Sequence, residues 1–467
     1  MRKTLNSPSV RAGILLALAS MSTPSAAGEN SSLEELRALI EQQAAQMETM
    51  KGRLKELEQR LTAGDDAAGD VTSEAADRSP MPTAPEATPL PSSIAWKGAP
   101  EITSPDGAFT AKLRGRVLGD AWGTSSRMDD VQYPAGATLR AARLGIEGRL
   151  GPVFRYKFEG DFAGDDVTVK DAYLQYAGPS GWAITLGNQK PPFSLEHMTG
   201  LPRTTFMERA LPNVFAISET LGASVATAGS GWTFALGVYG ETPGTELDAP
   251  EGHSVVGRAS FAPVYGEDRV LHLGVSGYDR NMSSASGAGF RIRQRPEIRV
   301  FGSRLVDTGA NPADSATAMA LEFAGTRGPF AVQGEYMRSD VDYRALPDAT
   351  FGGAYLQASW FLTGENRPYD VKKAAFGRVK PNAPFDQGGR GAIELAARFS
   401  TLDLSDGLIE GGEEDNFTLG INWYPTAYAR IAFNWVYFDV DGNAATMPYG
   451  QAAHSGHGFG ARAQVDW

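Results

Sequence analysis

An alternation of apolar and charged side chains with a period of two constrains this chain more than any other feature of its sequence. In the segment 154–162, aromatic residues occupy every second position except Gly160, and charged residues fill the positions between them. A strand sends successive side chains to opposite faces, so one face of this segment is apolar and the other is charged. The segment 109–120 repeats the pattern, with Arg114 and Arg116 on its polar face. One face therefore meets hydrocarbon or a protein core, and the other meets water.

Comparable segments continue to the C-terminus, separated by clusters of Gly, Pro, Asn and Asp. Residues 109–467 provide about 22 residues for each of about 16 strands with its connection, which suits strands of about 10 residues with short turns and longer loops. We therefore predict an all-β fold, a transmembrane antiparallel β-barrel of about 16 strands within residues 96–467. Two soluble β-sandwiches are the alternative. Aromatic residues at the strand ends favour the barrel.

Two short segments near the N-terminus have clear signatures. Residues 1–27 combine a basic start, a short apolar run and small residues before Gly28, which is typical of a cleaved secretory signal peptide. The apolar run is well short of the roughly 20 residues that span a bilayer, which argues against a membrane anchor. Residues 63–95 are rich in Pro, Ala, Ser and Thr and predict a disordered linker. We expect export to the bacterial outer membrane.

Residues 28–62 are predicted to form a short coiled-coil helix. Apolar residues recur alternately three and four positions apart, with one polar interruption. The seam consists of Leu33, Leu36, Ile40, Gln43, Met47, Met50, Leu54, Leu57 and Leu61. Within this segment only copies of itself can bury the seam, so we expect an oligomer. A single amphipathic helix on the barrel or membrane is the alternative, and a contact between the coil and the cell wall is a further hypothesis.

Composition excludes several kinds of site. The chain has no Cys, so disulfides, Cys-ligated metals and the lipid attachment of lipoproteins are excluded. Its five His residues lack metal-type spacing, and it has neither a phosphate-cradling Gly-Lys-Ser/Thr loop nor a His-Glu-x-x-His motif. We therefore expect no catalytic residues, no cofactor and no metal. The net charge of −12 argues mildly against nucleic acid as a partner.

Four arginines are the main candidates for an anion path, and Arg116 is a further pore-lining candidate. Arg291, Arg293 and Arg295 follow one another at period two, and Arg299 comes soon after. In an extended segment their guanidinium groups lie about 7 Å apart and repel one another by about 0.6 kcal/mol in water. Passing anions relieve this repulsion, so the pattern favours a cationic ladder in a water-filled pore. A solvated loop edge is the alternative, because Gly, Ser and Asn precede the arginines.

The segment 190–219 interrupts the strand pattern. It is long and contains four prolines, and Lys190 is the first of its charged residues. These features make it a candidate for a constriction loop that folds into the barrel.

Six motifs occur in order along the chain. They are Leu113–Val117, Ala142–Gly148, Tyr156–Glu159, Lys170–Leu174, Leu186–Phe193 and Thr205–Arg209. Together they resemble the phosphate-selective porin O and P family. The resemblance implies an outer-membrane barrel of about 16 strands, usually trimeric, with loops folded inward around an anion channel. It also implies that the four arginines match the ladder of the anion-selective members and that Asp171 matches an acidic residue of the pore.

The resemblance further implies a phosphate site made of three lysines, of which this chain keeps one. His197 stands in the loop where phosphate-specific relatives have a lysine, and Asp370 replaces a second lysine. Lys380 keeps the third. We therefore expect an anion path with a weakened phosphate site, in which phosphate binds more strongly as the pH falls toward 6 and His197 gains a proton.

Taken together, these features predict a water-filled, anion-selective channel for passive uptake of small inorganic anions such as phosphate or polyphosphate. A weakly selective general diffusion porin is one alternative. A structural barrel that tethers the outer membrane to the cell wall is another, from a different functional class. The expected partners are small anions, outer-membrane lipid and two further copies of the chain in a homotrimer.

Deletion of residues 31–61 tests the role of the coil. We expect the deletion variant to remain a heat-stable, SDS-resistant trimer, because the apolar outer faces of the barrels can pack together without the coil. The measurement is the oligomer size on unheated SDS gels. A purely monomeric variant would show that the coil, rather than the barrel, drives assembly.

Overall fold

The computed structural model describes residues 93–96, 98–124, 127–128, 131–132, 135–240, 252–282, 289–298, 304–442 and 453–467. The compact unit Pro89–Trp467 contains all of them. The expected signal peptide (1–27), coiled coil (28–62) and nearly all of the linker (63–95) lie outside these residues.

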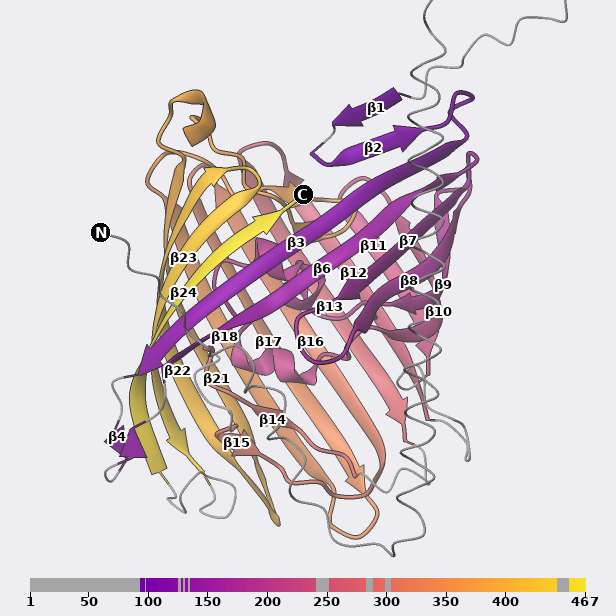
Figure 1. Cartoon of the computed structure of the whole chain (residues 1–467). Coiled ribbons are helices and arrows are strands. Elements are labelled where there is room, and N and C mark those ends of the chain that lie inside the picture. Colours follow the sequence, from indigo (N-terminus) through magenta and orange to yellow (C-terminus); the bar gives the residue numbers. More distant parts are fainter. Residues whose placement is uncertain are drawn as a thin grey trace, which may run out of the picture. The chain divides into compact units, whose positions relative to one another are not determined.

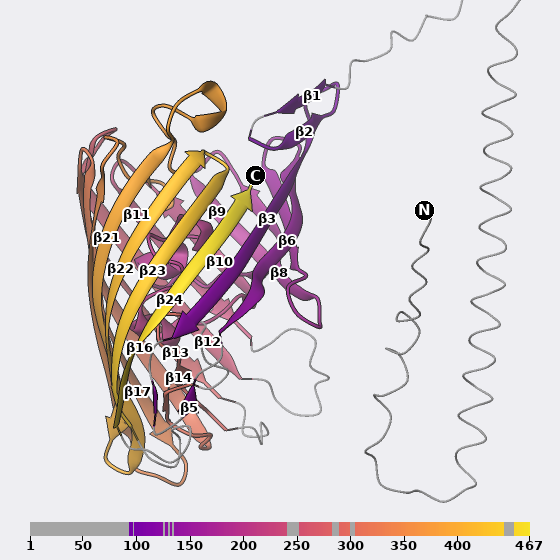
Figure 2. The same cartoon turned by 60° about the vertical axis from the view of Figure 1, so that its left-hand side comes forward.

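A closed antiparallel barrel dominates the structure (Figures 1 and 2). The main sheet has 18 strands, and all but β1 (Ser93–Trp96) and β2 (Pro100–Thr103) close into a barrel of 16. Its strands are β3 (Phe109–Thr124), β6 (Gly136–Leu150), β7 (Phe154–Asp161), β8 (Thr168–Ala177), β9 (Trp182–Gln189), β10 (Thr220–Ala228), β11 (Trp232–Tyr239), β12 (His253–Tyr265), β13 (Arg269–Asn281), β16 (Ala313–Arg327), β17 (Phe330–Tyr343), β18 (Ala349–Phe361), β21 (Ala392–Asp406), β22 (Ile409–Thr426), β23 (Ala429–Asp441) and β24 (Ala453–Asp466). The predicted all-β barrel is confirmed.

Pairing between the last strand and the first closes the barrel. β24 pairs with β3 over nine positions, from Gly458↔Thr124 to Asp466↔Arg116. Beyond this stretch β2 pairs with the same edge of β3. The backbone N–H of Trp467 donates to the carbonyl of Gly115 at 3.0 Å, and the Trp467 ring lies where a side chain at position 115 would begin, about 2.1 Å from the ideal Cβ position. Glycine at this position therefore lets the aromatic C-terminus close the seam.

The outer face of the barrel carries the apolar half of the alternation. Phe154, Phe158 and Phe162 are 41%, 51% and 53% exposed, whereas Glu159 and Asp161 are buried in the lumen. Exposed Leu, Ile, Val and Trp side chains continue this belt around the other strands. An apolar belt around a polar interior is the surface that a membrane-spanning barrel needs.

Within the part of the chain that the structure describes, no helix is both long and apolar enough to cross a membrane. The helical elements are α2 (Leu195–Met198), η1 (Leu201–Arg203), η2 (Leu211–Phe215) and η3 (Phe385–Gln387). Short strand pairs occur in the connections, namely β4 (Arg127–Met128) with β5 (Val131–Gln132), β14 (Arg293–Gln294) with β15 (Val306–Asp307), and β19 (Tyr369–Asp370) with β20 (Ala375–Phe376).

Three connections fold into the lumen. The segment 190–219 joins β9 to β10 and carries α2, η1 and η2, which lie inside the barrel (Figure 1). The segment 282–312 joins β13 to β16 and reaches the first one, because the Gln294 side chain donates to the carbonyl of Leu211 at 3.2 Å. The segment 362–391 joins β18 to β21, and the wall residue Arg258 donates to one of its carbonyls at 2.8 Å. The expected inward-folding loop at 190–219 is therefore present.

Glycines on the inner wall make room for these loops. A Cβ at Gly420 of β22 would lie 3.1 Å from the ring of Phe206, and a Cβ at Gly460 of β24 would lie 3.1 Å from Met207 and 2.9 Å from Ile298. Such separations are tighter than ordinary van der Waals contact. The two inner segments thus pack directly on the backbone of the wall.

Replacement of Gly460 by Val tests this packing. The added side chain overlaps Met207 and Ile298 and should destabilise the inner position of both segments by about 1–3 kcal/mol, a typical cost of overpacking. We expect a larger single-channel conductance in planar bilayers, because the loops then fill less of the lumen. Ala463→Val is the matched control, since Ala463 is exposed on the outer face of the same strand. Equal conductance of the two variants would contradict the packing argument.

Candidate functional site

Buried ion pairs fix the segment 190–219 to one wall of the lumen. Arg462 of β24 donates to Asp120 of β3 at 2.7 Å and to Glu208 of the loop at 2.8 Å. Arg140 of β6 donates to the same Glu208 at 2.6 Å. Because removing one partner leaves an uncompensated buried charge, such contacts hold their elements firmly in place.

A second group of ion pairs joins two inner segments. Arg398 of β21 is fully buried, and it donates to Glu196 of the loop at 3.3 Å and to Glu297 of the segment 282–312. Thr418 of β22 also donates to Glu297, at 2.7 Å. The two inner segments therefore share one anchor on the β21–β22 side of the barrel.

The wall formed by β7 to β9, which follows β6 in the sheet, is less covered. Lys157 of β7 and Asp171 of β8 form an ion pair at 2.6 Å, and their side chains stay 21% and 16% exposed. Lys170 of β8 lies 3.8 Å from Glu219, and its side chain is 24% exposed. Since the loops fill the other side, we infer that the open part of the lumen follows this wall.

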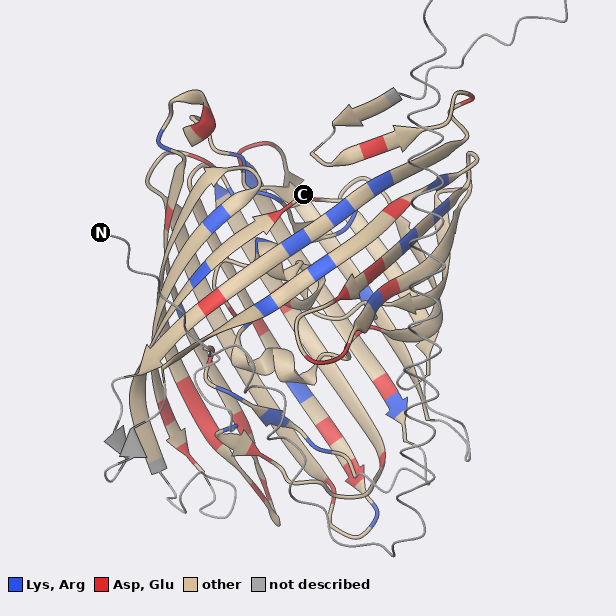
Figure 3. Cartoon of the chain, in the orientation of Figure 1, with Lys and Arg blue, Asp and Glu red and all other residues tan. Residues whose placement is uncertain are grey.

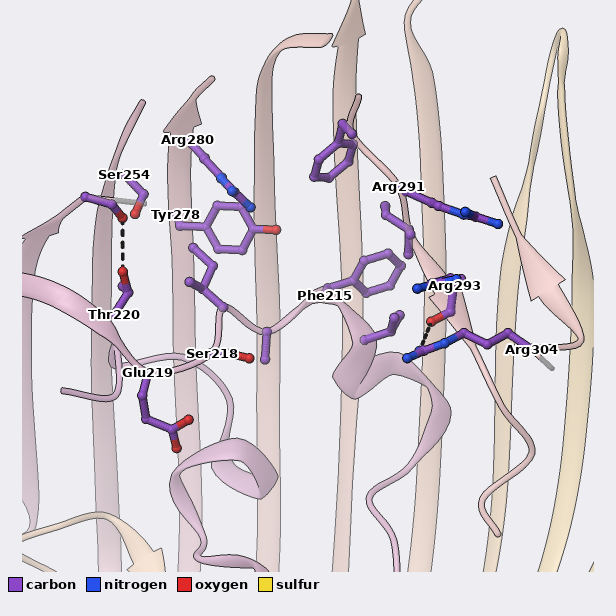
Figure 4. Close-up of a pocket in the computed structure, with 16 residues that line it drawn as sticks. Phe215, Ser218, Glu219, Thr220, Ser254, Tyr278, Arg280, Arg291, Arg293 and Arg304 are labelled. Atoms are coloured by element: carbon purple, nitrogen blue, oxygen red, sulfur yellow. Dashed lines mark hydrogen bonds between the residues drawn. The ribbon is translucent and has the colours of Figure 1, made fainter. Parts of the chain in front are cut away.

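A cavity of about 410 Å³ lies where the segment 282–312 meets the end of the constriction loop. Among the residues that the structure describes, four arginines line it, together with one carboxylate, that of Glu219. Arg280 comes from the end of β13 and lies on one side, while Arg293 and Arg304 lie on the other (Figure 4). The fourth arginine is Arg291. Such a lining attracts anions, because guanidinium groups offer several donors to each oxyanion.

Three of the four arginines of the expected ladder lie among the described residues. Arg291 and Arg293 are exposed while Ile292 between them is buried, which is the alternation of an extended segment. Asp307 of β15 holds the Arg291 guanidinium, with 2.7 Å between Nε and Oδ1, and so offsets its charge. Arg295 is half-buried and is not part of the cavity lining. Arg299 lies outside the described residues.

Arg280 and Arg304 were not among the predicted site residues. Arg280 is the second-last residue of β13 and Arg304 precedes the short strand β15, so neither belongs to the period-two run. Only the folding of the loop brings them to one cavity. Arg116 of β3, which was predicted, faces the lumen and lies 3.4 Å from Glu159.

The three positions of the expected phosphate site are not joined. Asp370 is part of a turn, where it accepts the N–H of Lys372 at 3.0 Å and pairs with the Lys373 ammonium at 3.5 Å. Lys380 is exposed further along the same segment. His197 lies in α2 and is 7% exposed. Among the described residues no hydrogen bond or ion pair connects His197, Asp370 and Lys380.

Protonation of His197 near pH 6 was expected, and the structure argues against it. Burial and the nearby charges of Lys190 and Arg209 hold the pKa of His197 well below its usual range. Lys190 is the group that we expect to titrate near neutral pH instead. Burial, and next the charge of Arg209, lower the pKa of the Lys190 ammonium to about 7, although Glu219 at 3.9 Å opposes this shift.

Positively and negatively charged residues are both frequent on the barrel and its inner segments (Figure 3). The described residues include no group of three or more His, Asp or Glu side chains arranged to hold a metal ion.

A family model described as phosphate-selective porin O and P matches residues 111–467. The chain belongs to this family. It is 27% identical to Porin O of Pseudomonas aeruginosa over 396 residues, which cover 74% of this chain and 87% of the relative. A protein of Caulobacter vibrioides described as uncharacterized is 31% identical over 447 residues, covering 91% of this chain and 89% of the relative.

Solved porin structures share the fold. An anion-selective porin from Comamonas acidovorans superposes with a TM-score of 0.50 at 13% identity, covering 77% of this porin and 100% of that chain. Family and fold together place this porin in the bacterial outer membrane, where an apolar belt faces lipid and a polar lumen crosses the membrane.

Titration of Lys190 gives a testable pH response. With a pKa of about 7, lowering the pH from 8 to 6 adds about 0.8 of a positive charge to the loop. The chloride-to-potassium permeability ratio should therefore rise as the pH falls, and Lys190→Met should remove most of this rise. Chloride does not titrate in this range, so reversal potentials in asymmetric KCl isolate the protein's contribution. A pH response that survives in Lys190→Met would assign it to another group.

Proposed function

We propose that this porin is an anion-selective channel for the passive uptake of small inorganic anions, with phosphate and polyphosphate as the first candidates. The observation that carries the proposal is the arginine-lined cavity between the segment 282–312 and the end of the constriction loop. Among the described residues, four arginines and one glutamate line it. Family membership also supports an anion channel, because the family description names phosphate selectivity.

The position of the cavity makes its charge effective. It lies next to the end of the constriction loop, and Glu219 joins the loop end to the lysines of the β8–β9 wall. A cationic cavity raises the local concentration of anions beside the constriction loop. Lysines further along the wall then offer the next contacts. A ladder of moderate contacts favours throughput, because binding must remain weak enough for the anion to leave.

The expected weak affinity for phosphate agrees with the places of His197, Asp370 and Lys380 in the structure. Asp370 is engaged in its own turn, and His197 is packed inside the loop. We expect phosphate to slow chloride current in the millimolar range only. A weakly selective general diffusion porin is the second candidate, since Arg291 is already offset by Asp307 and Glu219 adds a negative charge to the same cavity.

The apolar outer face supports a further part of the proposal, a homotrimer. Leu144 and Ile146 of β6 and Val465 of β24 are 48%, 37% and 48% exposed on neighbouring parts of the seam. Such surfaces can pack against copies of themselves as well as against lipid. Contact with the cell wall through the coil belongs to the alternative of a tethering barrel, which a non-conducting channel would favour.

Replacement of Arg280 and Arg293 by Ala tests the selectivity. Both side chains line the cavity, so the double variant should lower the chloride-to-potassium permeability ratio by about twofold or more. Reversal potential in asymmetric KCl across a planar bilayer is the measurement. Arg338→Ala is the matched control, because Arg338 is exposed on the outer face and pairs with Asp340 at 2.7 Å.

The wild-type channel decides between the candidates before any variant is made. A clear preference for chloride supports the anion channel. Equal permeability to chloride and potassium would favour the general diffusion porin. An unchanged ratio in the double variant would show that the cavity does not generate the selectivity.

A further inference from the structure

Glu219 is the carboxylate among the described residues that line the arginine cavity. It is the last residue before β10, so it ends the constriction loop that Lys190 begins. Its carboxylate points away from Arg280 and Arg293 in Figure 4. There it lies between the ammonium groups of Lys170 and Lys190, which come from different elements of the chain.

These two ion pairs are loose. The carboxylate oxygens of Glu219 lie 3.8 Å from Lys170 Nζ and 3.9 Å from Lys190 Nζ, beyond hydrogen-bond distance. The three side chains remain between 16% and 24% exposed. By contrast, Arg258 and Glu322 elsewhere in the lumen lie 2.7 Å apart and are 4% and 0% exposed. A wet pair without a hydrogen bond exchanges its partner far more readily than a dry one.

The neighbouring carboxylate, Asp171, has its own partner. Its carboxylate accepts a hydrogen bond from the ammonium of Lys157 at 2.6 Å. Lys170 therefore pairs with Glu219. Glu219 also pairs with Lys190, whose ammonium donates to the carbonyl of His197 at 2.9 Å. Two ammonium groups thus face one carboxylate, an arrangement that also fits a small oxyanion with two or more oxygens.

We propose that Lys170 and Lys190 form an oxyanion-binding site that Glu219 occupies as an internal competitor. The proposal rests on the anion channel proposed above and names the residue that sets its affinity for phosphate. A phosphate ion from the arginine cavity must take the place of the Glu219 carboxylate to reach both lysines. Occupancy by the competitor keeps phosphate binding weak, and weak binding lets the ion leave again.

Replacement of Glu219 by Gln is the direct test. The amide keeps the shape of the side chain and removes the negative charge. We expect the phosphate concentration that halves the chloride current to fall at least tenfold. The measurement uses the full-length porin in planar bilayers with inorganic phosphate at pH 6, where Lys190 is mostly protonated. Glu147→Gln is the matched control, because Glu147 lies on the neighbouring β6 wall and pairs with Arg114 at 3.4 Å. Its half-blocking concentration should stay within about twofold of the wild type.

The alternative role of Glu219 is a latch that merely holds the ends of the loop together. Lys190→Met removes the same latch but leaves the negative charge. A latch predicts that Glu219→Gln and Lys190→Met change conductance and phosphate block in the same direction. A competitor predicts opposite effects, with tighter block in Glu219→Gln and weaker block in Lys190→Met. Lys170→Met in the Glu219→Gln background should then restore weak block.

Two outcomes separate this proposal from the proposed function. A wild-type channel that prefers chloride, together with unchanged or weaker phosphate block in Glu219→Gln, would overturn the competitor and leave the anion channel standing. A wild-type channel without preference for chloride would overturn the anion channel itself. Tenfold tighter block in Glu219→Gln, lost again in the double variant with Lys170→Met, supports the competitor.

Discussion

Buried contacts between wall arginines and loop acceptors determine the shape of the lumen. Arg398, Arg430 and Arg462 project inward from β21, β23 and β24, and each donates to the segment 190–219. The loop carries carboxylates and free carbonyls to meet them, so few donors on this side are left to water. A charged side chain buried in a barrel needs such partners, because its desolvation would otherwise cost several kcal/mol. The inward fold of the loop follows from the charges of the wall.

The fold could be predicted from the sequence because its signal is local. Alternation in a segment such as 154–162 depends only on neighbouring residues, and the same rule assigns Glu159 to the lumen and Phe158 to the outer face. The number of strands could be estimated from the length of the chain, because each strand needs about 10 residues to cross the membrane. The period-two run likewise predicted that Arg291 and Arg293 share a face, and in the structure both are exposed while Ile292 between them is buried.

The site could be predicted only in part, because its partners are far apart in the chain. Asp307 offsets Arg291 from 16 residues away, and Arg280 and Arg304 reach the cavity through the fold of a loop. His197 illustrates the same limit. Its place in the sequence suggested a pore residue, but burial beside Lys190 and Arg209 depends on how the loop packs. Motif position identifies a segment, whereas burial and charge partners follow from tertiary contacts.

One wall of the lumen is packed with loops and another is open, so the charges in the lumen are unevenly distributed. The composition of the whole chain does not show this. The chain is acidic as a whole, with a net charge of −12, yet most of the charged residues described at the cavity are arginines. In tight pairs on the packed wall, such as Arg462 with Asp120, the two charges neutralise each other, and the pairs stabilise the fold. The loose pairs of the open wall, Lys170 and Lys190 with Glu219, stay in contact with water and can exchange partners. Selectivity in this porin should therefore depend on the arginines of the cavity and on the loosely paired charges along the open wall, and far less on the many charges that are buried.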